Sequence, residues 1–444
     1  MKIVFLEVRS KTSVYEEIAE EIGRIDDQVE IYWIVQNKLF SKIKSDNIFF
    51  LEFPKTSFSK YDKPKLDHLD EEVISADRFH IHFESTCWHY VNYRRQVEDI
   101  LRKISPDVVF GELGNFFTHY ACLWSKKNSI PFYDIESARF PKGCVGVFLY
   151  DKWNPVKLRD VKSSDVENFI NDFRTLKPVP DYMVRPEDWN DLLRNKLKLI
   201  NHKVKLLRGY VSGERYCTQH PIKNILEKIR VRQRLKLWDK ASCGIDEVMG
   251  KKKKILLYPL QMQPEFNLEV WGRPWSDQQQ VIMSLLDKMP DDWVLLIKAN
   301  PKPYFEMNRI DLMALVGDPK IMFLERGVSM QEIDSCVDIV ATVTGTVQIE
   351  RIINNKPVYI IGDTPFRKFS CIRDGIDWLT GAELDLATRF SLSDDQVRQA
   401  ARLLLECSAP GIMGEPVSNG SCLERRNIER LTAVVLEVIS KHKT

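Results

Sequence analysis

The chain alternates short apolar segments with amphipathic ones, and it does so in two separate series. Alternation of this kind predicts a parallel sheet that is covered by helices on both faces. A chain of 444 residues is also too long for one ordinary core. We therefore expect two doubly wound α/β domains. The expected strands are 2–8, 29–35, 107–110 and 131–135 in the first series, and 255–258, 293–298, 320–324, 339–342 and 357–361 in the second.

The region between the two series has a different character. Residues 151–250 are highly charged, helical in period and interrupted by several prolines. No Gly/Ser-rich linker marks a sharp boundary. We predict an N-terminal α/β domain at 1–205, a helical connection at 206–250, a C-terminal α/β domain at 251–392 and a helical tail at 393–444, with the tail broken at 409–420.

Composition limits the class of protein. Lys+Arg number 65 and Asp+Glu 63, a net charge of +2, so the chain as a whole is not an electrostatic nucleic-acid binder. The basic runs 196–205 and 251–254 are interpreted as solvated surface, with contact to phosphates or anionic lipid as the alternative. Nine cysteines without a CxxC pair predict reduced thiols. No run of about 18 apolar residues is present, and the start reads as a strand rather than a signal peptide, so we expect a cytoplasmic protein.

Polar residues follow the strands of the second series. Because the carboxyl ends of parallel strands meet at one edge of a sheet, we expect these side chains to converge and bind a ligand. The candidate binding residues at this edge are Gln261, Gln263, Lys298, Asn300, Arg326, Thr344, Gly345, Thr346 and Glu350.

The stretch Thr344-Gly345-Thr346 precedes a helix, so its backbone N–H groups predict an anion cradle. The alternative is an ordinary strand-to-helix turn with threonine capping. Lys298 and Arg326 would add positive charge for a phosphate. Glu350 is interpreted as a ribose ligand or, equally, as a surface carboxylate.

Two carboxylates are candidates for catalysis. Glu265 follows a proline-bounded turn at a strand end, where it could attack an anomeric carbon or act as a base. Glu112 holds the matching position in the first series, as a general base or acceptor ligand; the alternative is a helix cap formed together with Asn115. Further candidates on the acceptor side or in the cleft are Glu136 and Arg139, which pair or line the cleft, and Trp271, which stacks on a sugar or packs in the core.

Other patterns give no signal. His80 and His82 have no neighbouring Cys/His cluster, and His220 precedes a proline, so no metal site is predicted. There is neither a Walker lysine loop nor a GxGxxG fingerprint. We expect no cofactor apart from a nucleotide-sugar substrate.

The second series resembles the capsular polysaccharide biosynthesis family of bacterial glycosyltransferases, which includes the CMP-Kdo-using β-Kdo transferases. The resemblance covers about 255–366. It is carried by YPLQMQPE at 258–265, Asp277-Gln278, Met289-Pro290, KANP at 298–301, TGTV at 344–347, Glu350, NKPV at 355–358 and Gly362-Asp363, and more weakly by the region 136–139.

This resemblance implies a GT-B-like architecture of two Rossmann-type domains that face a central cleft, with helical insertions. It also implies a metal-independent transferase that moves Kdo or a related ulosonate from a CMP-linked donor. In the β-Kdo branch a carboxylate nucleophile acts with retention, and Glu265 holds the matching position. The family usually has His-Pro where this chain has Asn300 followed by Pro301; asparagine keeps a hydrogen-bond donor but removes a titratable group.

The expected role is in capsule or O-antigen synthesis, with donor bound by the C-terminal domain and a lipid-linked or oligosaccharide acceptor by the N-terminal one. Peripheral contact with the inner face of the inner membrane is a further expectation, and no nucleic-acid partner is expected. A UDP-sugar-dependent transferase, an epimerase-like enzyme and a non-catalytic polysaccharide-binding assembly protein remain as alternatives.

Overall fold

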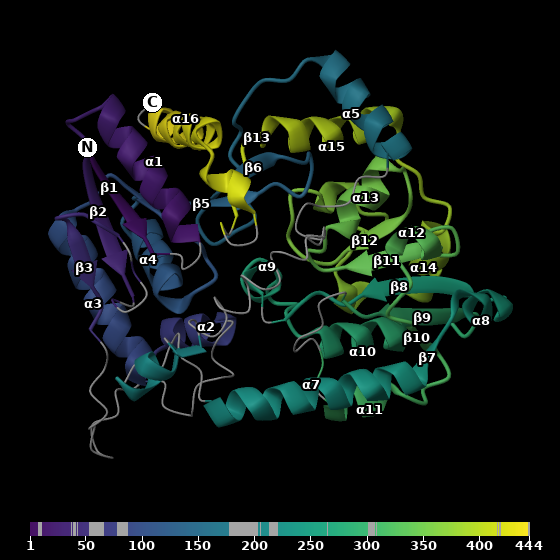
Figure 1. Cartoon of the computed structure of the whole chain (residues 1–444). Helices are drawn as coiled ribbons and strands as arrows, with labels where there is room; N and C mark the ends of the chain where they lie inside the picture. The colour runs from purple at the N-terminus through teal and green to yellow at the C-terminus, as the bar shows by residue number, and fades with distance from the viewer. Residues whose placement is uncertain are drawn as a thin grey trace. The chain divides into compact units, whose positions relative to one another are not determined.

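A computed structural model describes residues 1–7, 11–36, 38, 41, 43–52, 66–77, 88–176, 203–204, 206–212, 221–263, 265–300, 307, 309–414, 416 and 419–442. The chain folds into two compact units (Figure 1). Unit 1 contains residues 1–162 and 404–442 with part of 203–224, and unit 2 contains 163–176 and 225–403. Each unit is described by itself.

Unit 1 is built on a seven-stranded sheet in the order β13-β6-β5-β4-β1-β2-β3. The five strands from β5 to β3 are parallel, and β6 and β13 extend the sheet in antiparallel fashion. The strands are β1 (Lys2–Leu6), β2 (Glu30–Val35), β3 (Ile48–Phe50), β4 (Val108–Phe110), β5 (Phe132–Ser137), β6 (Cys144–Leu149) and β13 (Ala409–Pro410); the helices are α1 (Thr12–Ile25), α2 (His68–Ala76), α3 (Trp88–Ile104), α4 (Phe116–Lys127) and α16 (Arg425–His442).

The core of unit 1 joins the two ends of the chain. Ile3 and Phe5, two positions apart, lie on the same face of β1. Helix α1 buries Val14, Ile18 and Ile22, at helical spacing, against the same core. The apolar stripe of α16 belongs to this core, and α16 lies against α1.

The region predicted as a separate C-terminal tail, 393–444, is divided between the two units. Helix α15 (Asp394–Glu406) lies largely in unit 2, whereas residues 404–442 complete unit 1. Residues Ala409 and Pro410, which were expected only as a break, pair with Val145 and Cys144 as an edge strand. Local periodicity predicts helix α16 but not the sheet on which it packs, because the first strand of that sheet, β1, lies at the other end of the chain.

Unit 2 is built on a six-stranded parallel sheet in the order β12-β11-β8-β9-β10-β7. Its strands are β7 (Ser242–Cys243), β8 (Lys254–Pro259), β9 (Trp293–Lys298), β10 (Ile321–Leu324), β11 (Ile339–Thr342) and β12 (Val358–Ile360); its helices are α5 (Ser163–Leu176), α7 (Pro221–Ala241), α8 (Ile245–Gly250), α9 (Phe266–Glu269), α10 (Gln278–Lys288), α11 (Arg309–Leu315), α12 (Met330–Ile333), α13 (Val347–Ile353), α14 (Gly381–Ala387) and α15.

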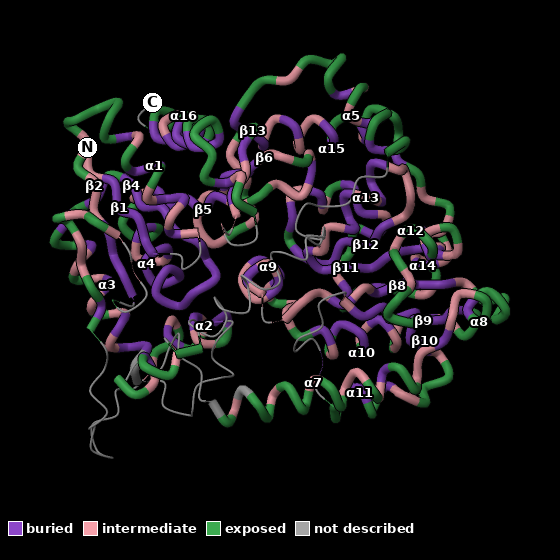
Figure 2. Tube along the Cα trace, in the orientation of Figure 1, coloured by how far each residue is buried: buried purple, intermediate pink, exposed green. Residues whose placement is uncertain are grey.

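The predicted α/β class with two doubly wound units is confirmed. The central strands of both sheets are mostly buried along their length (Figure 2), as expected for sheets covered on both faces. The segment predicted as a separate connection at 206–250 instead contributes β7 to the edge of the second sheet and places Trp238 in its core.

The structure also bears on the predictions about cysteines and about membrane-spanning segments. The cysteines within the described ranges are free thiols. No helix in those ranges combines the length and the apolar character needed to cross a membrane.

Candidate functional site

Each sheet has a topological switch point, where the strand order reverses direction. The switch lies between β1 and β4 in unit 1, and between β8 and β11 in unit 2. Ligands of open α/β sheets bind at the carboxyl ends of the strands on either side of such a point. Glu112 follows β4, Gln261 follows β8 and Thr344 follows β11, so the sequence prediction places candidate residues at both switch points.

In unit 2 the two loops at the switch point are locked together by Gln261 and Thr344. The Gln261 Nε2 donates to the Thr344 Oγ1 at 2.8 Å, and the Thr344 N–H donates to the Gln261 Oε1 at 3.0 Å. The Thr344 hydroxyl in turn donates to the carbonyl of Asn267 at 2.9 Å. Both side chains therefore shape the site by joining its loops.

A glutamine network extends from this lock. The Gln278 Nε2 donates to the Gln261 carbonyl and to the Gln263 Oε1, both at 2.8 Å. The Gln263 amide donates in turn to the Glu269 carboxylate at 2.9 Å. Gln263, predicted to bind donor, thus has its amide engaged within the loop. Gln278 was not predicted as a site residue, although its buried position at the first turn of α10 makes it the centre of the network.

The Thr-Gly-Thr stretch forms a tight strand-to-helix turn. The Gly345 N–H donates to the Thr342 Oγ1 at 3.0 Å, and a Cβ on Gly345 would lie 2.5 Å from that oxygen, so only glycine fits without rearrangement. The Thr344 N–H donates to Gln261 in the neighbouring loop and the Gly345 N–H donates within its own turn, so both donors have partners within the protein. The anion cradle stays a prediction. Thr346 begins α13 without a side-chain capping bond.

Lys298 ends the buried strand β9 and is only 5% exposed. Its neighbour Ile297 points into the core, so strand alternation directs Lys298 to the opposite face of the sheet. Burial lowers the pKa of Lys298, and the Glu332 carboxylate only partly offsets this; it is the one charged group acting on the amine in the described part of the chain. An ammonium so placed favours an anionic ligand.

Two other predicted donor ligands are placed differently. The Asn300 Nδ2 approaches the carbonyl of Leu260 at 3.4 Å, which keeps it beside the same loop as Gln261. The Arg326 guanidinium forms two bonds to the Asp239 carboxylate, at 2.7 and 2.8 Å. The Arg326 guanidinium therefore links the end of β10 to α7. Its predicted contact with a phosphate is not supported, because the Asp239 carboxylate already binds two of its N–H groups.

Glu350 lies on α13 and is half-buried. Burial, and to a lesser degree the carboxylate of Asp334, raises the pKa of Glu350 to about 7. A carboxyl group that is poised near neutrality at a switch point is a candidate for contact with a polar ligand. This placement favours the ribose-ligand interpretation over an ordinary surface carboxylate.

Glu265 and Trp271 flank the short helix α9. Glu265 is the N-cap residue in extended conformation, and its side chain forms no capping hydrogen bond, so the carboxylate is not engaged in holding the helix start. Trp271 is 5% exposed and packs edge-on against Phe266 at 4.8 Å between ring centroids. An indole in this position presents no face for a sugar to stack on, so the structure supports the core interpretation of Trp271.

In unit 1, Lys11 bridges two of the predicted carboxylates. Its Nζ lies 2.7 Å from the Glu136 Oε1 and 3.6 Å from the Glu112 Oε2. Although burial opposes the charge, the carboxylates of Glu112 and Glu136 raise the pKa of Lys11 above its usual range. The ion pair joins the end of β5 to the switch point between β1 and β4.

The alternatives for the neighbouring residues are now resolved in part. Asn115 is the N-cap of α4 and forms no side-chain capping bond, and the Glu112 carboxylate lies 3.6 Å from the Lys11 Nζ. The carboxylate of Glu136 also pairs with Lys11, while the Arg139 guanidinium lies 5.0 Å from the Trp153 ring.

Sequence reasoning missed a third carboxylate in this cluster. Asp134 is fully buried in β5; its Oδ2 accepts from the Leu113 N–H at 3.2 Å, and its Oδ1 has no hydrogen-bond partner in the described ranges. Burial, followed by the negative charge of Glu136, raises the pKa of Asp134 well above its usual range. The available signal was an aspartate in the middle of an apolar strand, because such a residue is rare unless it is paired or functional.

We expect Asp134→Asn to stabilise unit 1 at neutral pH. A raised folded-state pKa means that the carboxyl stabilises the fold below its unfolded pKa and that this contribution is lost as pH rises through the folded value. Asparagine stays neutral, so the variant should gain about 1 to 3 kcal/mol over the parent at pH 8 and little or nothing at pH 4. Urea unfolding across this pH range measures it; a stability difference that stays flat or shrinks with pH would contradict the assignment.

Metal binding has no support in the described residues, where no group of three or more His, Cys, Asp or Glu side chains is placed to hold an ion. His80, His82 and His220, considered and set aside as metal ligands, lie outside the described residues.

Comparison of the chain with protein-family models and with curated proteins gives no match. Among solved structures, the β-Kdo 2,7 transferase of Thermosulfurimonas dismutans KpsC is 12% identical over 99% of each chain, with a TM-score of 0.37. UDP-GlcNAc 2-epimerase of Neisseria meningitidis, bound to UDP-GlcNAc, is 15% identical over 91% of this chain and 99% of that one, with a TM-score of 0.29. At such TM-scores neither activity carries over to this chain.

Proposed function

We propose that the chain is a GT-B-type glycosyltransferase that transfers Kdo or a related ulosonate from its CMP-linked donor to a glycan acceptor during synthesis of a surface polysaccharide such as capsule or O-antigen. Unit 2 binds the donor, and unit 1 binds and deprotonates the acceptor. Glu265 attacks the anomeric carbon as the bond to the phosphate breaks and CMP leaves, or it stabilises the positive charge that forms there. The acceptor oxygen then bonds to this carbon, displacing Glu265 where it is bound, while Glu112 takes the proton of the acceptor hydroxyl.

The observation that carries the proposal is the buried Lys298 beside the locked loops of the unit 2 switch point. A CMP-ulosonate brings one phosphate and one carboxylate, and either group would add negative charge to the partial compensation that Glu332 gives this buried ammonium. Because the ammonium neutralises the departing phosphate directly, the transfer does not require a metal.

Glu350 supports the nucleotide part of the proposal. A half-buried carboxylate at the carboxyl edge of the sheet accepts hydrogen bonds from the two hydroxyls of a ribose. With a pKa of about 7 it is ionised in part of the molecules at neutral pH, and it becomes a stronger acceptor as pH rises.

The acceptor role of unit 1 is supported by the Lys11 ion-pair cluster. Carboxylates are the groups that accept protons from sugar hydroxyls, and three of them, Glu112, Asp134 and Glu136, gather around one lysine. The cluster is negative overall, so it does not suit an anionic nucleotide, and this division favours donor binding in unit 2.

A thermal-shift screen of the whole chain against CMP, UDP, GDP and ADP, with magnesium and with EDTA, tests the proposal. A ligand that binds only the folded state raises the melting temperature. We expect a metal-independent shift with CMP. A UDP-selective shift would favour a hexose transferase or an epimerase-like enzyme, and no shift with any nucleotide would favour a non-catalytic glycan-binding protein.

Lys298→Met gives the screen a specific signature. The apo protein should melt at a higher temperature than the parent, because a buried charge that Glu332 only partly compensates has been removed, while the CMP shift should fall by most of its size. Lys320→Met is the matched control: Lys320 is half-buried just before β10, at the amino end of the strands, and pairs with Asp291 at 2.7 Å. A CMP shift that survives in Lys298→Met would contradict the phosphate role.

A further inference from the structure

Helix α7 exposes apolar side chains on the side that faces solvent. Ile225, Leu226 and Ile229 are 60%, 46% and 44% exposed, and their spacing places all three on one face of the helix. A surface helix normally turns its polar face outward. Figure 2 shows most of α7 as exposed or half-exposed along its length.

The inward side of the same helix explains how it is held. Trp238 is buried, donates from its Nε1 to the Leu324 carbonyl at 3.0 Å and packs edge-on against Phe323. Arg234 donates to the Met307 carbonyl at 3.3 Å. Because unit 2 already holds α7 by this side, the exposed apolar residues are not needed for packing against the unit.

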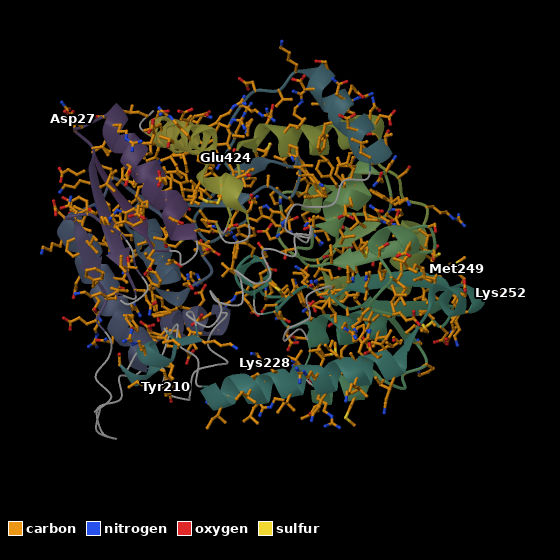
Figure 3. All side chains as sticks on the ribbon, viewed as in Figure 1. Asp27, Tyr210, Lys228, Met249, Lys252 and Glu424 are labelled. Carbon is orange, nitrogen blue, oxygen red and sulfur yellow. The ribbon has the colours of Figure 1, made fainter. Side chains whose placement is uncertain are left out.

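Basic residues surround the apolar patch. On a helical projection Lys228 (labelled in Figure 3) and Arg230 flank it on either side, and Arg232, Lys236 and Lys240 continue the same outward face toward the end of α7. The helix has seven basic and two acidic residues, a net charge of +5, whereas the whole chain carries +2. Positive charge is thus concentrated where the apolar side chains are exposed.

We propose that the outer face of α7, formed by Ile225, Leu226, Ile229, Arg232 and Lys236, is a docking surface for an anionic phospholipid membrane. Apolar side chains insert at the boundary between headgroups and acyl chains, while the lysines and arginines bind the headgroup phosphates; the combination gives reversible peripheral attachment. This inference does not rest on the proposed transferase activity, since the surface lies on the outside of unit 2 and not at its switch point.

Sedimentation of the full-length protein with lipid vesicles tests the proposal. We expect binding to vesicles of equal parts phosphatidylglycerol and phosphatidylcholine, little binding to phosphatidylcholine alone, and release as salt is raised, since screening weakens surface charge interactions. Ile225→Ser with Ile229→Ser, and separately Arg232→Gln with Lys236→Gln, should each weaken binding on the order of tenfold.

Matched controls lie elsewhere on unit 2. Met283→Ser with Leu386→Ser removes two apolar side chains that are also exposed, and Lys251→Gln with Lys252→Gln removes two exposed charges; both should bind as the parent does. A cooperative melting transition without ligand, at a temperature close to that of the parent, would show that each variant is folded, and the CMP shift of the same variants tests the donor site separately.

Three results would overturn the proposal. The first is no binding to anionic vesicles, and the second is binding that the control pairs weaken as much as the α7 pairs do. The third is a dimer in sedimentation equilibrium that Ile225→Ser with Ile229→Ser dissociates, because a second copy of the chain would then cover the patch.

Discussion

Glu265→Gln is expected to lower the rate of sugar transfer by a factor on the order of 10³ or more, while the protein stays folded and still binds CMP. Release of CMP from CMP-Kdo should fall equally with and without acceptor. The reason is that the proposed role of Glu265 is at the anomeric carbon, which reacts in both cases.

The structure explains why this substitution should leave the fold intact. The Glu265 backbone begins α9 in extended conformation, and its carboxylate makes no capping bond to the helix. Glutamine has nearly the same size and can take the same backbone conformation, so the start of α9 is kept while the charge and the nucleophilicity at this position are lost.

Glu269, one turn further along, is the matched control. Its carboxylate accepts from the Gln263 amide at 2.9 Å, a contact that holds the loop. Glu269→Gln should therefore lower thermal stability slightly and leave the transfer rate within a few-fold of the parent. Transfer that survives in Glu265→Gln, or that falls equally in both variants, would exclude a nucleophile at position 265.

Local periodicity was enough to predict most elements of both sheets. Strands such as Trp293–Lys298 are continuous apolar runs between turn residues, and helices such as Trp88–Ile104 keep one apolar face. Each can therefore be predicted from a short stretch of sequence. Short stretches of sequence do not show which distant segments pair or pack together. The place of α16 on a sheet that begins at Lys2, and the pairing of Ala409 with Val145, depend on contacts between distant segments.

The candidate site was predictable in location but less so in detail. The carboxyl ends of parallel strands are one edge of the sheet, so Gln261 and Thr344 could be expected to approach each other, and they do. Which polar atoms are left for a ligand depends on geometry that the sequence does not contain. Arg326 has a carboxylate partner 87 positions away, and the sequence does not show that Asp134 lies in one cluster with Glu112 and Lys11.

Glu112→Gln should separate acceptor chemistry from donor chemistry. If Glu112 is the base for the acceptor hydroxyl, transfer should fall by about 10² to 10⁴-fold. Donor binding in unit 2 should be unaffected, and slow CMP release to water should persist, since neither needs a base at this position. This pattern differs from the one expected for Glu265→Gln, in which release to water is lost as well.

Glu136→Gln is the natural comparison, because both carboxylates pair with Lys11. Loss of Glu136 leaves Lys11 beside Glu112, so we expect a weaker apparent affinity for acceptor and a smaller loss of rate. CMP release from CMP-Kdo, measured with and without acceptor for both variants, tests which of the two carboxylates takes the acceptor proton. Equal losses with and without acceptor in Glu112→Gln would mean that the Lys11 cluster supports the fold of unit 1 or the donor step, and not the acceptor proton.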